Sequence, residues 1–176
     1  MKASDTCELS YADVRVPAAN LLGEEGQAFR YLTANLPRER LSIGVNGVSM
    51  AAAAVRHTLA YVRDRTVFGK PLSTFQNTKF VLAECAAEIE AAQALVDKGL
   101  ELDDAGTLTA ADAAKIKLIG TETAGRVIDK CLQLHGGYGY VTEYPIARLY
   151  ADARVMRIFG GTSEVMKTII AKSLGI

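Results

Sequence analysis

The sequence contains few of the residues that build metal sites, disulfide frameworks or histidine-dependent catalytic centres. It has three cysteines and two histidines in 176 residues. The cysteines are scattered and odd in number, which favours a reducing compartment and argues against a disulfide framework or a zinc site. The histidines form no Glu-x-x-His pair, which disfavours a di-iron bundle, and they are too few for a Ser–His–Asp or Cys–His nucleophilic site. We therefore expect no bound metal.

Neither sign of charge predominates, and long apolar runs are missing. Twenty basic residues balance twenty acidic ones without forming a basic stripe, so nucleic acid is not an expected partner. No uncharged apolar run is long enough to cross a bilayer, and the first residues lack the apolar segment of a secretory signal. A hydrophobic content of 49% is ample for one domain with a substantial core. Together these features predict a soluble cytoplasmic protein.

The first 22 residues differ from the rest of the chain. Residues 6–17 contain short alternating stretches and end at a proline, which predicts one or two short strands. Two strands do not form a stable sheet alone, so we expect their partner strands to lie outside this sequence. We assign residues 1–22 to a remnant of a β domain and residues 23–176 to a helical domain.

From residue 23 onward the sequence signals are helical. We predict a first helix over about residues 24–36 and a second over about residues 37–65. The two are divided at Pro37, because proline is best tolerated in the first turn of a helix. Residues 68–71, Phe-Gly-Lys-Pro, are predicted to form a loop.

Two further long helices follow, each with a recognisable start. Ser73 followed by Gln76 predicts a capping box, and Thr109 with Asp112 predicts the start of the next helix, which ends at Gly136. The apolar stripe of the first is Leu82, Cys85, Ile89, Ala92, Val96 and Gly99; that of the second is Ala113, Ile116, Gly120, Ala124, Val127, Cys131 and Leu134. Shorter helices are predicted near residues 144–155 and 162–174. Long helices joined by brief loops predict an all-α fold, an antiparallel four-helix-type bundle.

Two glycines lie inside the second predicted helix. Gly44 and Gly47 each cost about 1 kcal/mol relative to alanine in a helix interior. Two such costs in one helix indicate that something packs closely against that face. Another helix and a bound ligand are equally good interpretations of the sequence.

Three short motifs have both a structural and a functional interpretation. Residues 160–164, Gly-Gly-Thr-Ser-Glu, form a glycine turn before a helix, which is either an ordinary N-cap or a set of free N–H groups that accepts an anion or a polarised oxygen. Arg65 and Lys70 flank a loop, where they are either solvated charges or phosphate ligands. Glu39 is in isolation best interpreted as a first-turn carboxylate favoured by the helix dipole.

The order and spacing of these pieces resemble the C-terminal helical domain of the acyl-CoA dehydrogenases. Residues 14–26 resemble the end of the family's middle β domain, and the resemblance covers nearly the whole chain. The motifs that follow in family order are Glu39-Arg40, Arg65-x-x-Phe68-Gly-Lys70, Gln76, Gln133-x-x-Gly136-Gly-x-Gly139, Glu143-Tyr-Pro145, Arg148, Asp152 and Gly161-Thr-Ser-Glu164.

The resemblance implies an FAD-dependent enzyme that oxidises an acyl-CoA thioester to the trans-2-enoyl-CoA. It also implies an electron-transfer flavoprotein or similar acceptor as partner, and an oligomer, most often a tetramer. The family's N-terminal helical domain and most of its β domain are absent from this sequence. We therefore expect this chain alone to be inactive and colourless.

The resemblance assigns roles residue by residue. It places Arg65, Phe68 and Gln76 at the FAD of a neighbouring subunit, with Gln133, Leu134, His135, Gly136 and Gly137 along its pyrophosphate and adenosine. It places Thr162, Ser163 and Glu164 at the flavin of their own subunit. Arg40 supports the acyl-CoA site, Gly161 touches the substrate, and the backbone N–H of Gly160 helps to stabilise the thioester oxygen.

One expected residue is missing from the pattern. Most of the family has its catalytic glutamate where this chain has Gly160, whereas the long-chain and isovaleryl types place the base on the helix that carries Glu39. We therefore predict that Glu39 is the base, in a sequence closest to that subgroup. An acyl-CoA oxidase on the same fold and a non-catalytic partner subunit of a heteromeric complex are the alternatives.

Overall fold

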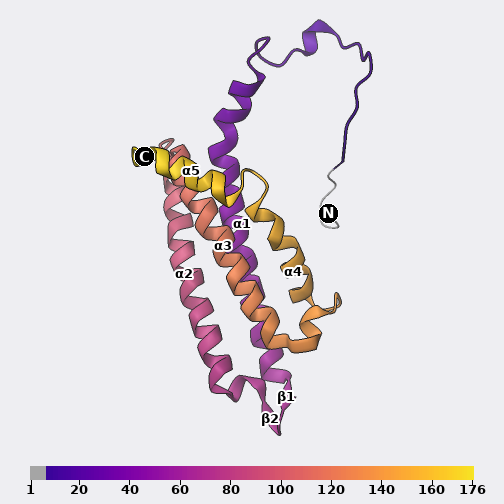
Figure 1. Cartoon of the computed structure of the whole chain (residues 1–176), viewed down its shortest axis with the longest axis vertical. Coiled ribbons are helices and arrows are strands. Elements are labelled where there is room, and N and C mark those ends of the chain that lie inside the picture. Colours follow the sequence, from indigo (N-terminus) through magenta and orange to yellow (C-terminus); the bar gives the residue numbers. More distant parts are fainter. Residues whose placement is uncertain (1–6) are drawn as a thin grey trace. The chain divides into compact units, whose positions relative to one another are not determined.

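The computed structural model describes residues 7–176, and helices dominate them (Figure 1). The long helices are α1 (Ala28–Asp64), α2 (Gln76–Asp104) and α3 (Ala110–His135), and the shorter ones are α4 (Pro145–Ala153) and α5 (Ser163–Ser173). Short 3-10 turns span Ala18–Asn20, Leu72–Thr74, Gly136–Tyr140 and Arg154–Arg157. The predicted all-α fold is confirmed, as are the two short helices near the C-terminus. Within the described range, no helix has the length and apolarity needed to span a membrane.

The chain divides into two compact units, residues 1–35 and 36–176. In the first unit, residues 7–22 contain no strand, so the predicted strands are wrong over the described part of that stretch, while residue 6 lies outside it. Extended residues need neighbouring strands to accept and donate their backbone hydrogen bonds, and within residues 7–176 no strand pairs with this stretch. The second unit contains every residue that the sequence assigned to a site.

Helix α1 continues through Pro37, so the predicted break at that residue is wrong. A proline inside a helix removes one backbone hydrogen bond, which leaves the carbonyl of Thr33 without its usual partner, but the residues on both sides stay helical. The helix begins at residue 28 rather than 24. Gly23 and Gly26 have φ values of +77° and +78°, which are incompatible with a right-handed helix.

The connection from α1 to α2 is a tight hairpin rather than the predicted open loop. Strands β1 (Thr66–Val67) and β2 (Lys70–Pro71) pair in antiparallel fashion. The two residues between them, Phe68 and Gly69, have φ values of +49° and +78°, as a two-residue turn of the primed type requires. The local backbone therefore favours close pairing over an irregular loop.

The predicted capping box at the start of α2 does not form. The N-cap of α2 is Phe75, whose side chain makes no capping bond, and Ser73 lies inside the preceding 3-10 turn. Ser73 is thus two residues too early to reach the first N–H groups of the helix. Gln76 is the first residue of the helix, not the third position that a capping box needs.

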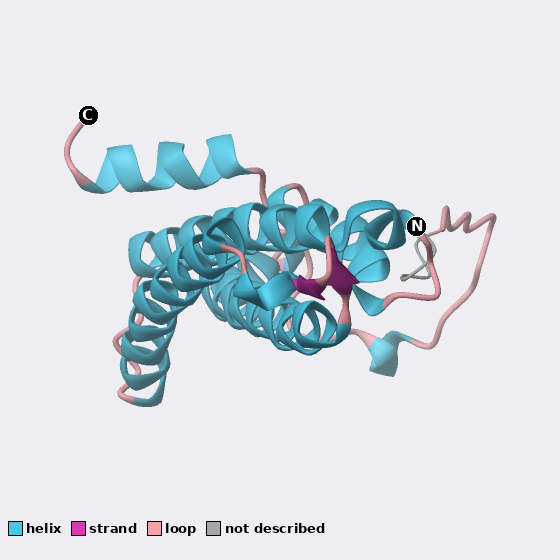
Figure 2. Cartoon of the chain, turned by 90° about the horizontal axis from the view of Figure 1, so that it is seen from below, coloured by secondary structure: helices cyan, strands magenta, loops and turns pink. Residues whose placement is uncertain are grey.

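The limits of α3 agree with the sequence. The hydroxyl of Thr109 accepts the backbone N–H of Asp112 at 3.1 Å, and Gly136 ends the helix with φ of +58°. The predicted stripe on this helix is buried, apart from Leu134, which is half-buried. Helix α3 consequently occupies the centre of the second unit, in contact with α2, α4 and α5 (Figure 1). Figure 2 shows, by colour, how little of the chain is strand beside its helices.

The partner of the helix glycines is another helix. An ideal Cβ on Gly47 would lie 2.8 Å from the carbonyl oxygen of Gly120, and one on Gly120 would lie 2.7 Å from the carbonyl oxygen of Gly44. Helices α1 and α3 therefore cross in backbone contact, with no room for a ligand between them. Apolar residues of both helices and of α2 cluster beside this crossing: Leu41, Val48, Ala92, Val96 and Ile116.

Candidate functional site

Two buried or nearly buried cations hold the glycine turn before α5. The Nε of Arg40, on α1, donates to the carbonyl of Gly160 at 3.1 Å. The Nζ of Lys117, on α3, donates to the carbonyls of Gly161 at 2.6 Å and Met156 at 3.0 Å. Gly160 and Gly161 have φ values of +63° and +104°, a region that favours glycine. The structure thus brings the predicted substrate residues Arg40 and Gly161 together with Gly160, whose backbone N–H was predicted to be catalytic.

Lys117 is the residue at this turn that the sequence analysis missed. Its side chain is 1% exposed, and burial together with nearby Arg40 lowers its pKa, partly opposed by Glu122. Buried lysines are rare unless their donors are satisfied, and two backbone carbonyls do this here. A signal was present in the sequence, because Lys117 lies four residues after Ala113 and four before Thr121, on a face of small residues.

The first turn of α5 contains the three residues predicted to contact the flavin of their own subunit. Thr162 is the N-cap, and its hydroxyl accepts the backbone N–H of Val165 at 3.3 Å. Ser163 is buried and donates to a carboxylate oxygen of Glu122 at 2.7 Å. The pKa of the exposed Glu164 is lowered by a hydrogen bond from its own backbone N–H and by Thr162.

Positions 39 and 160 differ in how readily each could hold the side chain of a catalytic base. Glu39 is exposed on α1, next to Arg40, whose side chain reaches the turn. An ideal Cβ at Gly160 would lie 2.6 Å from Cδ1 of Ile43, and the backbone there is left-handed. A side chain at position 160 would have to displace Ile43 and bear the cost of that conformation, about 1–2 kcal/mol. The local structure favours a carboxylate on α1.

The other predicted residues line a groove at the far end of α3. This groove of about 540 Å³ is lined by Tyr61, Arg65, Val67, Leu72, Gln133, Leu134, His135, Gly136, Gly137, Tyr138 and Val141. The Arg65 guanidinium lies 5.5 Å from the ring centre of Tyr138. The open face at Gly136 and Gly137, where a Cβ would meet nothing within 4 Å, leaves backbone accessible beside a cation. A phosphate-rich group with an aromatic ring fits this set of donors and rings.

Two of the side chains that line this groove, Tyr61 and His135, are stacked on each other. The rings of Tyr61 and His135 are stacked at 4.3 Å, and the Nδ1 of buried His135 lies 3.0 Å from the carbonyl of Cys131. Burial lowers the pKa of His135. Tyr61 in turn donates to the carbonyl of His135 at 3.2 Å, which ties α1 to the end of α3.

Phe68 and Gln76 do not line the groove. Phe68 is at the tip of the hairpin with 94% of its surface exposed, and Gln76 is an exposed residue at the start of α2. Their assigned contacts with a flavin stay predictions. Lys117 and His135 lie about 27 Å apart along α3, so the turn and the groove form two separate sites.

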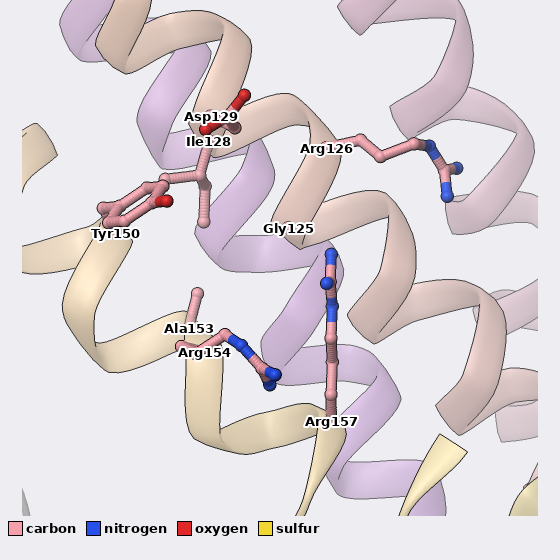
Figure 3. A pocket seen from close by; sticks show the side chains of 8 residues that line it. All are labelled: Gly125, Arg126, Ile128, Asp129, Tyr150, Ala153, Arg154 and Arg157. Carbon is pink, nitrogen blue, oxygen red and sulfur yellow. The ribbon is translucent and has the colours of Figure 1, made fainter. Parts of the chain in front are cut away.

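A further cleft of about 280 Å³ lies between α3 and α4 (Figure 3). Arg154 and Arg157 extend into it, whereas Arg126 points away toward α2. The Arg157 Nε is 3.3 Å from a Glu122 oxygen, and its guanidinium lies against Gly125, where a Cβ would be 1.7 Å from Nη2. Glycine at 125 thus makes room for an ion-paired arginine, and the cleft is a consequence of that packing.

Comparison with known proteins agrees with this geometry. Residues 26–175 match the family model described as acyl-CoA dehydrogenase, C-terminal domain. The chain is 45% identical to the long-chain specific acyl-CoA dehydrogenase, mitochondrial, of Rattus norvegicus, over 99% of this chain and 40% of that relative. The helical bundle thus corresponds to the C-terminal domain of this family. The chain belongs to the acyl-CoA dehydrogenase family.

Solved structures of relatives have the same fold. The acyl-CoA dehydrogenase of Geobacillus kaustophilus superposes with a TM-score of 0.90 at 45% identity, covering 94% of this chain and 44% of that one. Butyryl-CoA dehydrogenase of Megasphaera elsdenii superposes with a TM-score of 0.88 at 38% identity, covering 94% and 43%. The chain spans less than half the length of these relatives.

Proposed function

We propose that this chain is the C-terminal domain of an FAD-dependent acyl-CoA dehydrogenase that oxidises an acyl-CoA to the trans-2-enoyl-CoA. The observation that carries the proposal is the turn at Gly160–Gly161. Its carbonyls accept bonds from Arg40 and Lys117, while no residue in the range 7–176 accepts the backbone N–H of Gly160. A free N–H group beside buried cations is suited to a thioester oxygen on which negative charge develops.

Glu39 is the proposed base in this reaction. Removal of the α-proton requires a carboxylate near the turn, and Glu39 is adjacent to the arginine that holds Gly160. The β-hydrogen leaves as hydride to the flavin, which is the chemistry that the cofactor supplies.

The two separate sites support a cross-subunit arrangement of the flavin. Within one chain the turn and the groove are about 27 Å apart along α3. The groove with Arg65 and Gln133 would contact a flavin of a neighbouring subunit, and residues 162–164 that of their own subunit. The proposal therefore includes a homo-oligomer, a tetramer in the simplest case, with an electron-transfer flavoprotein or similar acceptor.

The free thiols Cys7, Cys85 and Cys131 suit a reducing compartment such as the cytoplasm.

The test is an anaerobic titration of the full-length protein that contains this chain. Acyl-CoAs of different chain length and branching are added to the wild type and to Glu39→Gln, and loss of the oxidised flavin absorbance is followed. We expect wild-type bleaching and a rate about 10²–10⁴-fold lower in the variant, the usual contribution of a general base. Glu101→Gln, at an exposed surface carboxylate that pairs with Lys98, is the matched control and should behave as wild type.

The outcomes separate the alternatives. Equal bleaching of wild type and Glu39→Gln would place the base on another residue. No bleaching by any acyl-CoA, together with copurification of a second chain, would indicate a non-catalytic partner subunit. Rapid reoxidation of the reduced flavin by oxygen would indicate an acyl-CoA oxidase.

A further inference from the structure

Side-chain hydrogen bonds, rather than the backbone bonds of a sheet or a helix, hold the glycine turn against α1 and α3. Residues 158–162 belong to neither the preceding 3-10 turn nor α5. Lys117 bonds to Met156, before this segment, and to Gly161, within it, and Arg40 on α1 bonds to Gly160 between them. Within residues 7–176, Lys117 is the side chain that bonds to the backbone on both sides of residues 157–160.

These bonds determine which way the peptide groups of the turn face. In a planar trans peptide the C=O and the N–H point in opposite directions. The carbonyl of Gly160 is directed at Arg40, so the N–H of Gly161 points away from it. The carbonyl of Gly161 is directed at Lys117, so the N–H of Thr162 points away as well. The N–H of Gly160 belongs to the preceding peptide, which lies between the two carbonyls that Lys117 bonds.

Lys117 also brings a charge close to the turn. An ideal Cβ at Gly160 would lie 3.5 Å from the Lys117 Cε. The nearest carboxylate acting on the lysine is Glu122, which is engaged by Ser163 and Arg157. A buried cation that is not neutralised by a dedicated partner stabilises negative charge nearby more strongly than a solvated one.

We infer that Lys117 is a positioning residue for dehydrogenation, holding residues 157–160 between the carbonyls of Met156 and Gly161 so that the Gly160 N–H meets the thioester oxygen as negative charge develops there. This inference rests on the proposed function. Lys117 does not touch the substrate. It acts through the two carbonyls that it bonds and through its charge behind the turn.

The test compares Lys117→Met in the full-length holoenzyme with the wild type. Methionine keeps the length and apolar stem of the side chain but removes both hydrogen bonds. Lys117→Gln, which keeps a donor nitrogen with two N–H groups on a shorter side chain, is the second variant in case the methionine variant folds poorly. Lys130→Met is the matched control, because it makes the same change on α3 at an ion pair with Glu88 that is remote from the turn.

The decisive readout is enolisation of a bound substrate analogue, not turnover alone. A 3-thiaacyl-CoA has an acidic α C–H but no β-carbon hydrogen to transfer, and its enolate gives a long-wavelength band with oxidised flavin. We expect Lys117→Met to form about tenfold less enolate at a given pH. We also expect kcat to fall about 10–100-fold with KM changed less than threefold, as loss of an interaction made only in the transition state predicts. Lys117→Gln should lie between methionine and wild type, with flavin content unchanged in both.

The results distinguish the positioning role of Lys117 from a general effect on the bundle and from failure of the proposed function. Normal enolisation in both Lys117 variants, while the wild type is active, would overturn the inference and leave the proposed function intact. A loss in Lys130→Met as large as in Lys117→Met would also overturn it, because a general effect on the bundle would then explain both. A wild type that neither enolises the analogue nor oxidises any acyl-CoA would overturn the proposed function, and the inference with it.

Discussion

Adding a single methyl group at Gly120 should force α1 and α3 apart. The ideal Cβ at this position would lie 2.7 Å from the carbonyl oxygen and 3.1 Å from the Cα of Gly44. Both atoms belong to a helix backbone, which cannot rotate out of the way as a side chain can. Relief requires the two helices to separate by roughly 0.5–1 Å, in a core packed at the density of an organic crystal.

Two opposing effects set the magnitude of Gly120→Ala. Alanine improves intrinsic helix stability by about 1 kcal/mol over glycine. Overpacking of a tight core costs typically 1–3 kcal/mol, and a clash with rigid backbone belongs at the upper end of that range. We therefore expect a net loss of about 1–2 kcal/mol in the free energy of unfolding.

Gly125→Ala is the matched control on the same helix. Here the clashing atom is the Nη2 of Arg157, the far end of a flexible side chain. The arginine can swing away at the cost of a partly exposed ion pair with Glu122, which contributes at most about 1 kcal/mol. Since the gain in helix stability is of similar size, the net change should be close to zero.

The assay is urea unfolding of the chain and its two variants, followed by circular dichroism. Gly120→Ala should lower the midpoint while leaving the slope unchanged, and Gly125→Ala should leave the midpoint within error of the wild type. If Gly120→Ala were as stable as Gly125→Ala, or more stable than the wild type, the backbone contact between α1 and α3 would be refuted.

Three further predictions concern other parts of the second unit. Thr109→Ala removes the cap of α3 and should lower the free energy of unfolding by about 1 kcal/mol in the same urea assay. Arg65→Ala should weaken flavin retention in the full-length protein about tenfold, measured by equilibrium dialysis, whereas Tyr138→Phe, which keeps the ring beneath the guanidinium, should not. Burial lowers the pKa of His135 below 6.5, so the unfolded chain binds that proton first as the pH falls. Stability should therefore decrease from about pH 6.5 toward pH 5.5 and do so less in His135→Asn, as measured by urea midpoints at both pH values.

Local patterns predicted most of the secondary structure because the signals there are local. The start of α3 follows from Thr109 and Asp112, its end from Gly136, and its buried face from apolar residues three and four apart. These features depend on capping bonds and periodicity within one helix. The resemblance to the family rested likewise on ordered motifs in the sequence, and the comparisons confirmed it.

Local rules failed where two tendencies competed. Proline at position 37 favours the first turn of a helix, yet α1 incorporates it, since one lost hydrogen bond is a small cost in a helix of 37 residues. Ser73 and Gln76 have the spacing of a capping box, but the 3-10 turn that contains Ser73 shifts the start of α2 beyond its reach. The backbone around each residue, not its identity, decided the outcome.

The sequence by itself determined most of the helices, the family and the list of candidate residues, because each depends on residue type and spacing along the chain. Only the tertiary structure decided what those residues meet. It showed that Gly44 and Gly47 face a helix rather than a ligand, and that Lys117 holds the turn at Gly161. The physical reason is that close packing and the hydrogen bonds of a buried charge join residues more than forty positions apart, and periodicity along one helix does not say which distant residue lies opposite it.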